Sequence, residues 1–205
     1  MGLTADRLKA SLDALGDIEP AFASAIARIG YPAPRIRDRG YETLVRAVVG
    51  QQVSTKAAAA ILIKVDAATG GLGDPAKVAA TSDEALRAAG LSRQKILYVK
   101  SLAEEVLSGR LDFAALPEDD EEAIALLTRA KGIGRWTAEV YLLFAEARTD
   151  VWPAGDLAVQ VEIGRILGLE ERPTEKRVRE LAEPWRPYRG AAAIFAWHHR
   201  HVVPV

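Results

Sequence analysis

Two short stretches of the chain carry residues whose types and spacing could do chemistry. In the first, Gly132 and Gly134 enclose a single apolar residue and are followed at once by Arg135. Glycine permits the positive φ that ends a helix in a left-handed cap, and it permits close approach of another backbone. A helix that starts directly after such a turn exposes free N–H groups and the positive end of its dipole. The combination predicts a site for a phosphate oxygen, to which Arg135 adds a positive charge.

The second stretch holds Asp156, immediately before a segment whose apolar residues have helical spacing. The plain interpretation is a helix N-cap, because aspartate there accepts hydrogen bonds from free N–H groups. The same position favours an ionised carboxylate, which beside a sugar ring can stabilise an oxocarbenium-like transition state or orient an attacking water. Gly155 would permit close approach of a second backbone. From these residues alone, both interpretations of Asp156 stay open.

The elements that must position these residues all have helical patterns. Apolar residues recur at helical spacing on both sides of the glycine turn, in 121–130 and 135–145, so the turn joins two helices. Helix signals recur along the whole chain without convincing strand alternation, which predicts an all-α fold of roughly ten helices. The segments 31–39, 70–75 and 150–155 carry proline and glycine and are predicted to be loops.

Composition excludes several classes of protein. The 205 residues, 49% of them hydrophobic, suffice for one large domain or two small lobes. The absence of cysteine excludes disulfides and a cysteine-held iron–sulfur cluster. No apolar run approaches the length of a membrane span and the N-terminus lacks a signal-peptide pattern, so we expect a cytoplasmic protein without a membrane. A net charge of −1 argues against tight nonspecific binding of nucleic acid and favours transient contact through a local face.

The two stretches together resemble a known family. Lys131–Ala138 followed by Pro153–Asp156 is similar to the signature of the HhH-GPD superfamily of DNA glycosylases, which joins a helix-hairpin-helix to a Gly/Pro-rich loop and an aspartate. The branch that the chain most resembles is that of the AlkA-type 3-methyladenine DNA glycosylases II. The likeness runs from about residue 41 to 200 and includes Leu44–Ser54, Gly90–Lys95, Trp185–Arg189 and Ala196–Trp197.

The resemblance implies a fold of two helical lobes and a role for Asp156 as the catalytic aspartate. One lobe, about 41–148, would carry a DNA wedge and the hairpin, and the other, about 1–40 with 149–205, would carry Asp156. The backbone N–H groups around Gly132, Gly134 and Arg135 would bind a phosphate next to the damaged base. The implied partner is double-stranded DNA containing damaged bases, bound by a monomer associated with the nucleoid.

Other residues take roles by the same resemblance. Gln52 aligns with the wedge that fills the gap left by a flipped base, although two adjacent glutamines could also be a solvated corner. Gln51, Trp136 and Trp197 would border the base pocket, while Trp197 also fits a buried helix face. Family members hold a Na⁺ or K⁺ ion with backbone carbonyls of the hairpin, and by the resemblance these carbonyls are those of Thr128, Ala130 and Ile133.

Trp136 bears on the type of reaction. Bifunctional members have at this position a lysine that attacks the sugar, whereas tryptophan cannot be a nucleophile and Lys131 lies on the other side of the turn. The resemblance therefore implies a monofunctional enzyme that hydrolyses the N-glycosidic bond of 3-methyladenine and 7-methylguanine in duplex DNA. Such alkylated purines are cationic, and a tryptophan face attracts a flat cation.

The chain also departs from the family pattern. Lys131 stands where a proline is common, Ala154-Gly155 replaces Gly-Pro, and Val140 stands where another pocket aromatic is expected. A glycosylase for deaminated or mismatched bases, and a noncatalytic helix-hairpin-helix DNA-binding protein, therefore stay as alternatives. A second cluster comprises His198, His199 and His201. Adjacent histidines point to different faces of a helix, so we expect a surface cluster near DNA rather than a metal site.

Overall fold

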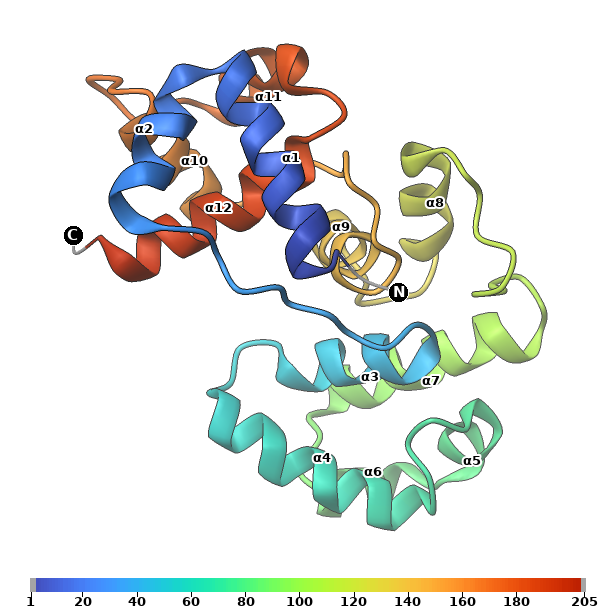
Figure 1. The fold of residues 1–205 in the computed structure, drawn as a ribbon. Helices are drawn as coiled ribbons and strands as arrows, with labels where there is room; N and C mark the ends of the chain where they lie inside the picture. Colours follow the sequence, from blue (N-terminus) through green and yellow to red (C-terminus); the bar gives the residue numbers. More distant parts are fainter. Residues whose placement is uncertain (1–2, 204–205) are drawn as a thin grey trace. The chain divides into compact units, whose positions relative to one another are not determined.

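The computed structural model describes residues 3–203, which form twelve α-helices and one short 3-10 helix (Figure 1). These residues contain no strand, and the predicted all-α class is confirmed. None of the helices within 3–203 is both long and apolar enough to cross a bilayer. The chain divides into two compact units, one running up to Arg37 and resuming at Leu142, the other Asp38–Tyr141. The boundaries expected from the sequence, near 41 and 148, lie a few residues later along the chain.

The unit Asp38–Tyr141 is organised around one long helix, α7. Capped by Ser92, whose hydroxyl accepts the Lys95 N–H, α7 buries one side against α3, α5 and α6. Ile96, Val99 and Leu102 of α7 are buried, and so are the valines of α3, the helix that lies beside α7 (Figure 1). The helices of this unit are α3 (Tyr41–Gly50), α4 (Thr55–Thr69), α5 (Pro75–Ala80), α6 (Asp83–Ala88), α7 (Arg93–Leu107), α8 (Asp120–Leu127) and most of α9 (Arg135–Phe144).

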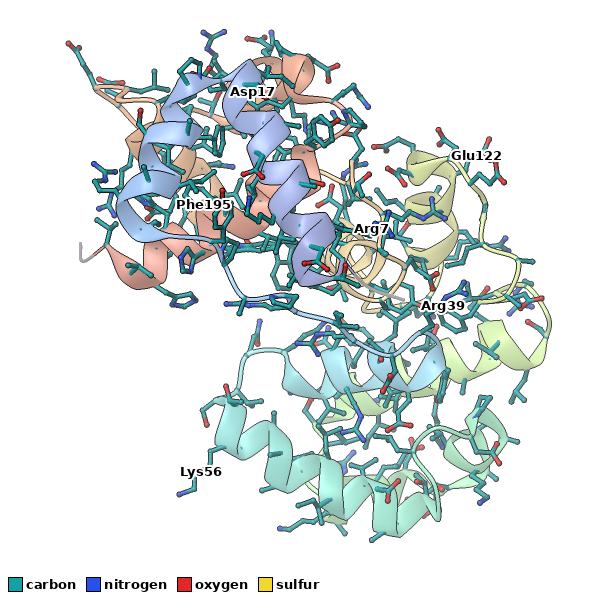
Figure 2. All side chains as sticks on the ribbon, viewed as in Figure 1. Arg7, Asp17, Arg39, Lys56, Glu122 and Phe195 are labelled. Carbon is teal, nitrogen blue, oxygen red and sulfur yellow. The ribbon has the colours of Figure 1, made fainter. Side chains whose placement is uncertain are left out.

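The other unit packs its helices on α12, whose residues 190–196 are all buried. Small side chains let α12 approach its neighbours closely, and a Cβ on Gly190 would lie only 2.6 Å from the Thr149 carbonyl oxygen. Phe195 lies among the side chains that fill this interior (Figure 2) and meets Phe22 edge to face. The elements are α1 (Ala5–Ile18), α2 (Pro20–Ile29), α10 (Leu157–Ile166), α11 (Glu175–Ala182), the 3-10 helix η1 (Glu183–Trp185) and α12 (Arg189–Val202).

Candidate active site

The glycine turn joins α8 to α9 directly, as the sequence predicts. Within it the Ile133 N–H donates to the Ala130 carbonyl oxygen at 3.1 Å. Gly132 has a φ of +85°, a left-handed conformation that favours glycine, but it does not cap α8, which ends at Leu127 with Thr128 as its C-cap. The predicted helix-hairpin-helix is confirmed, and both of its helices are formed without a longer loop.

Gly132 is required by its surroundings as well as by its φ. A Cβ built on it would lie 2.2 Å from Cγ of Tyr98, whose ring comes from α7 and covers the turn. Any other residue would have to displace that ring. The glycine therefore serves the close packing of the turn on α7.

We expect Gly132→Ala to lower the free energy of unfolding by about 2–4 kcal/mol, because left-handed backbone and overpacking both oppose it. Gly109→Ala is the matched control, since Gly109 also has a positive φ, +73°, but an added Cβ would meet nothing within 4 Å. It should cost only about 1–2 kcal/mol. Urea unfolding followed by circular dichroism measures the stability of both variants. Equal losses of unfolding free energy would show that the Tyr98 ring moves aside without an energetic cost.

Gly134 differs from Gly132 in what surrounds it. Its φ lies outside the left-handed region, and an added Cβ would meet nothing within 4 Å. The close approach that the sequence suggested is therefore not to a neighbour within the chain. The fold gains nothing from glycine at this position, so the open space beside the start of α9 is available to a ligand backbone.

Trp136 lies in the first turn of α9 and is 50% exposed. A large aromatic side chain is usually buried unless it has a binding role, so this exposure is informative. The ring therefore lies beside the N-terminus of α9.

The turn between α3 and α4 holds the two glutamines. Gln52 is exposed and has a φ of +56°, which is rare for a residue with a side chain and is typical of functional sites. Gln51 is half-buried and its side-chain amide donates to the Gly132 carbonyl oxygen at 3.0 Å. The predicted wedge residue thus stands on a strained, exposed turn, while Gln51 contacts the hairpin.

Asp156 is the N-cap of α10, as the sequence predicts. Its Oδ1 accepts the Val159 N–H at 3.0 Å, and the side chain is only half-buried. The hydrogen bond from Val159 fixes the carboxylate at the helix N-terminus, where the helix dipole is positive. The same unit holds Trp197 on α12, half-buried and tilted at 35° against Phe144 with ring centroids 5.7 Å apart.

Comparison with known proteins decides the family. A model described as the HhH-GPD superfamily base excision DNA repair protein matches residues 45–187, which include the hairpin and Asp156. The chain belongs to the HhH-GPD superfamily. It is 39% identical over 161 residues to DNA-3-methyladenine glycosylase 1 of Schizosaccharomyces pombe, covering 77% of this chain and 71% of that protein.

Two solved structures are similar over most of this HhH-GPD protein. A DNA-3-methyladenine glycosidase from Bacillus halodurans has a TM-score of 0.85 and 34% identity, covering 92% of this chain and 88% of that one. The 3-methyladenine DNA glycosylase Mag1 of Schizosaccharomyces pombe, in complex with abasic DNA, has a TM-score of 0.81 and 33% identity, covering 95% and 98%. The resemblance read from the motifs is confirmed.

Arg135, from which the sequence predicts a positive charge for a phosphate, is paired with two carboxylates in this HhH-GPD protein. Its guanidinium donates to Glu121 at 2.8 Å and to Glu139, also at 2.8 Å, and Glu139 is buried. The hydrogen bond to Glu121 and the charges of both carboxylates raise the pKa of Arg135, which keeps its guanidinium charged and engaged in these ion pairs. The phosphate site predicted at the turn therefore depends on backbone N–H groups and the helix dipole.

In the other unit Gly155 is exposed, and the nearest atoms that an added Cβ would meet belong to the Glu175 carboxylate, at an ordinary 3.5 Å. The approach of a second backbone there stays a prediction, whereas one expectation for the histidines is corrected. His199 is not part of a surface cluster, since it is buried and its Nδ1 lies 2.8 Å from Oε2 of buried Glu162. His198 faces the Ile29 carbonyl instead, at 3.4 Å. Residues 3–203 hold no group of three or more side chains arranged for a metal.

The loop before Asp156 is held by residues that the sequence analysis missed. Gln160 lies on α10, one helical turn after Asp156. Its buried side-chain amide donates to the Ala154 carbonyl oxygen at 2.8 Å. The Trp152 indole donates to the Val178 carbonyl oxygen at 3.4 Å and packs edge to face on Trp185. The spacing of Asp156 and Gln160 on one helix face was the only available signal, since Trp152 depends on distant residues.

Proposed function

We propose that this protein is a monofunctional DNA glycosylase that releases alkylated purines, 3-methyladenine and 7-methylguanine, from duplex DNA. The observation that carries the proposal is Asp156, fixed at the N-terminus of α10 by its bond to Val159 and supported by the pinned loop before it. A noncatalytic DNA-binding protein would need the hairpin but no such carboxylate. The named relatives, which are 3-methyladenine glycosylases, support the same substrate class.

The chemistry asks little of the protein beyond position and charge. As the bond between C1′ and the purine nitrogen breaks, its electron pair goes to the base and cancels the positive charge of the alkylated ring. The sugar gains oxocarbenium character, which the Asp156 carboxylate stabilises. A water oxygen then bonds to C1′ and gives up one proton to the carboxylate or to solvent. The products are a free base and an abasic site, with both strands intact.

The hairpin would hold the phosphate beside the damaged nucleotide. Its N–H groups at the start of α9 lie next to the open space at Gly134. Carbonyls of Thr128, Ala130 and Ile133 are hard oxygen donors that suit a Na⁺ or K⁺ ion. The Ala130 carbonyl accepts one N–H and keeps a second lone pair for such an ion, which would add positive charge near the phosphate.

The deciding experiment incubates the protein with methylated duplex DNA and separates the released bases by chromatography. Release of 3-methyladenine and 7-methylguanine, absent with unmethylated DNA, is the expected result. Duplexes containing hypoxanthine or uracil test the alternative substrate class in parallel. Duplex binding without release of any base would favour the noncatalytic alternative and contradict the proposal.

Trp136 separates hydrolysis from lyase chemistry. Borohydride should trap no covalent adduct with the unmodified protein, and strand breaks should appear only after alkali or heat. Trp136→Lys should not improve release of alkylpurines, because it replaces the ring face by a like charge, whereas Trp136→Phe should lose on the order of 1–2 kcal/mol of transition-state stabilisation. Robust trapping by the unmodified protein would instead require an attacking amine and contradict the monofunctional assignment.

A further inference from the structure

One face of α7 contacts both turns that the proposed function assigns to DNA. Its residues Lys95, Tyr98 and Ser101 lie on successive turns of the helix. Lys95 donates to the Val49 carbonyl oxygen at 2.7 Å, just before the turn that carries Gln52. At the hairpin, the Tyr98 ring covers Gly132, and the Ser101 hydroxyl accepts the Lys131 N–H at 3.1 Å.

Lys95 has an unusual place for a lysine. It is half-buried, makes no ion pair within residues 3–203, and bonds to a carbonyl at the C-terminal end of α3. A positive charge there is favourable because it meets the negative end of the helix dipole. Burial lowers the pKa of the Lys95 ammonium, so holding the charge in this position has a cost.

The turn above Lys95 is the strained one. Gln52 adopts a φ of +56°, and such a backbone persists only where surrounding contacts fix it. Two contacts do so, the Lys95 ammonium on the α3 end and the Gln51 amide on the Gly132 carbonyl oxygen, 3.0 Å away. The second contact joins this turn directly to the hairpin, which α7 holds from the same face.

We propose that α7 sets the spacing between the Gln52 turn and the phosphate-binding turn, and that Lys95 is the positioning residue for the wedge. A wedge can fill the gap in the base stack only if the neighbouring phosphate is held at a fixed distance from it. Both turns belong to the unit Asp38–Tyr141, and the α7 face contacts both. The inference rests on the proposed function of Gln52 and the hairpin.

The test is a double-mutant cycle that joins Lys95→Met to Gln52→Ala, read by single-turnover release of 3-methyladenine. Lys95→Met alone should slow release about 10-fold to 100-fold, the scale expected of a misplaced group. In the Gln52→Ala background, adding Lys95→Met should slow release by less than about twofold, because the wedge through which Lys95 acts is already gone. Binding to undamaged duplex, which needs the hairpin alone, should change by less than about twofold.

Lys100→Met is the matched control. Lys100 lies on the same helix, where its ammonium bridges Asp83 at 2.5 Å, away from both turns. Its loss should leave base release within about twofold of the unmodified protein, as for most exposed ion pairs. If Lys95→Met fails to fold, Lys95→Gln takes its place in the cycle, since it also removes the ammonium from the Val49 carbonyl oxygen.

Two results would overturn the inference. The first is an equal loss from Lys95→Met with and without Gln52, which would give the lysine a role independent of the wedge. The second is read without activity, by hydrogen exchange of the free protein. Lys95→Met should speed amide exchange at residues 50–53 and Lys100→Met should not, so unchanged exchange there refutes the coupling even if the protein releases no base. Absence of base release with faster exchange would count against the proposed function alone.

Discussion

Replacing Asp156 by asparagine should slow base release by about 10²-fold to 10³-fold or more while leaving the protein folded. Asparagine is as good an N-cap as aspartate, so its side-chain oxygen still accepts the Val159 N–H that Asp156 accepts at 3.0 Å. What it lacks is the negative charge that would face the developing oxocarbenium ion. The loss should therefore appear in the single-turnover rate and not in the melting temperature.

Asp74→Asn controls for removing a charge from a helix N-cap. Asp74 caps α5 and accepts the Ala76 and Lys77 N–H groups, in a helix that carries no proposed site residue. It should release base at the rate of the unmodified protein. Near-normal turnover by Asp156→Asn would reduce Asp156 to an N-cap and leave the chain without its proposed catalytic carboxylate.

Local backbone chemistry explains why so much of the hairpin and of Asp156 could be predicted. The left-handed φ of Gly132 and the capping bond of Asp156 depend on a few neighbouring residues, and the residue types there suit few other conformations. The all-α class follows from apolar spacing in the same way. A further part, the roles of Trp136, Trp197 and Gln52, came from resemblance and not from any local rule.

The side-chain contacts that could not be predicted from the sequence are contacts with residues on other helices. Arg135 pairs with Glu121 from the preceding helix, and buried His199 has its Nδ1 2.8 Å from Oε2 of Glu162 on another helix. An isolated sequence shows that such side chains are charged or titratable but not which opposite group lies beside them. Packing decides this, since a buried carboxylate such as Glu162 must be paired.

Gly134→Asp should weaken binding to damaged and undamaged duplex alike, by about 10²-fold, because a like charge facing a phosphate costs several kcal/mol. The substitution is informative because the fold leaves the position open. A Cβ there meets nothing within 4 Å, so the variant should unfold at the same urea concentration as the unmodified protein. Loss of binding would then report on the ligand and not on the turn.

Gly134→Ala separates the steric part of this effect from the charge. It adds only a methyl group in the space that the phosphate is proposed to use, so it should weaken binding less than Gly134→Asp and show no change in stability. Titrations at several salt concentrations measure the two variants, because a lost phosphate contact also lowers the dependence of affinity on salt. If Gly134→Asp bound both duplexes with the same dissociation constants as the unmodified protein, the turn would be only a structural connection between α8 and α9. The N-terminus of α9 would then have to be abandoned as the phosphate site, since Arg135 at that position is already paired with Glu121 and Glu139.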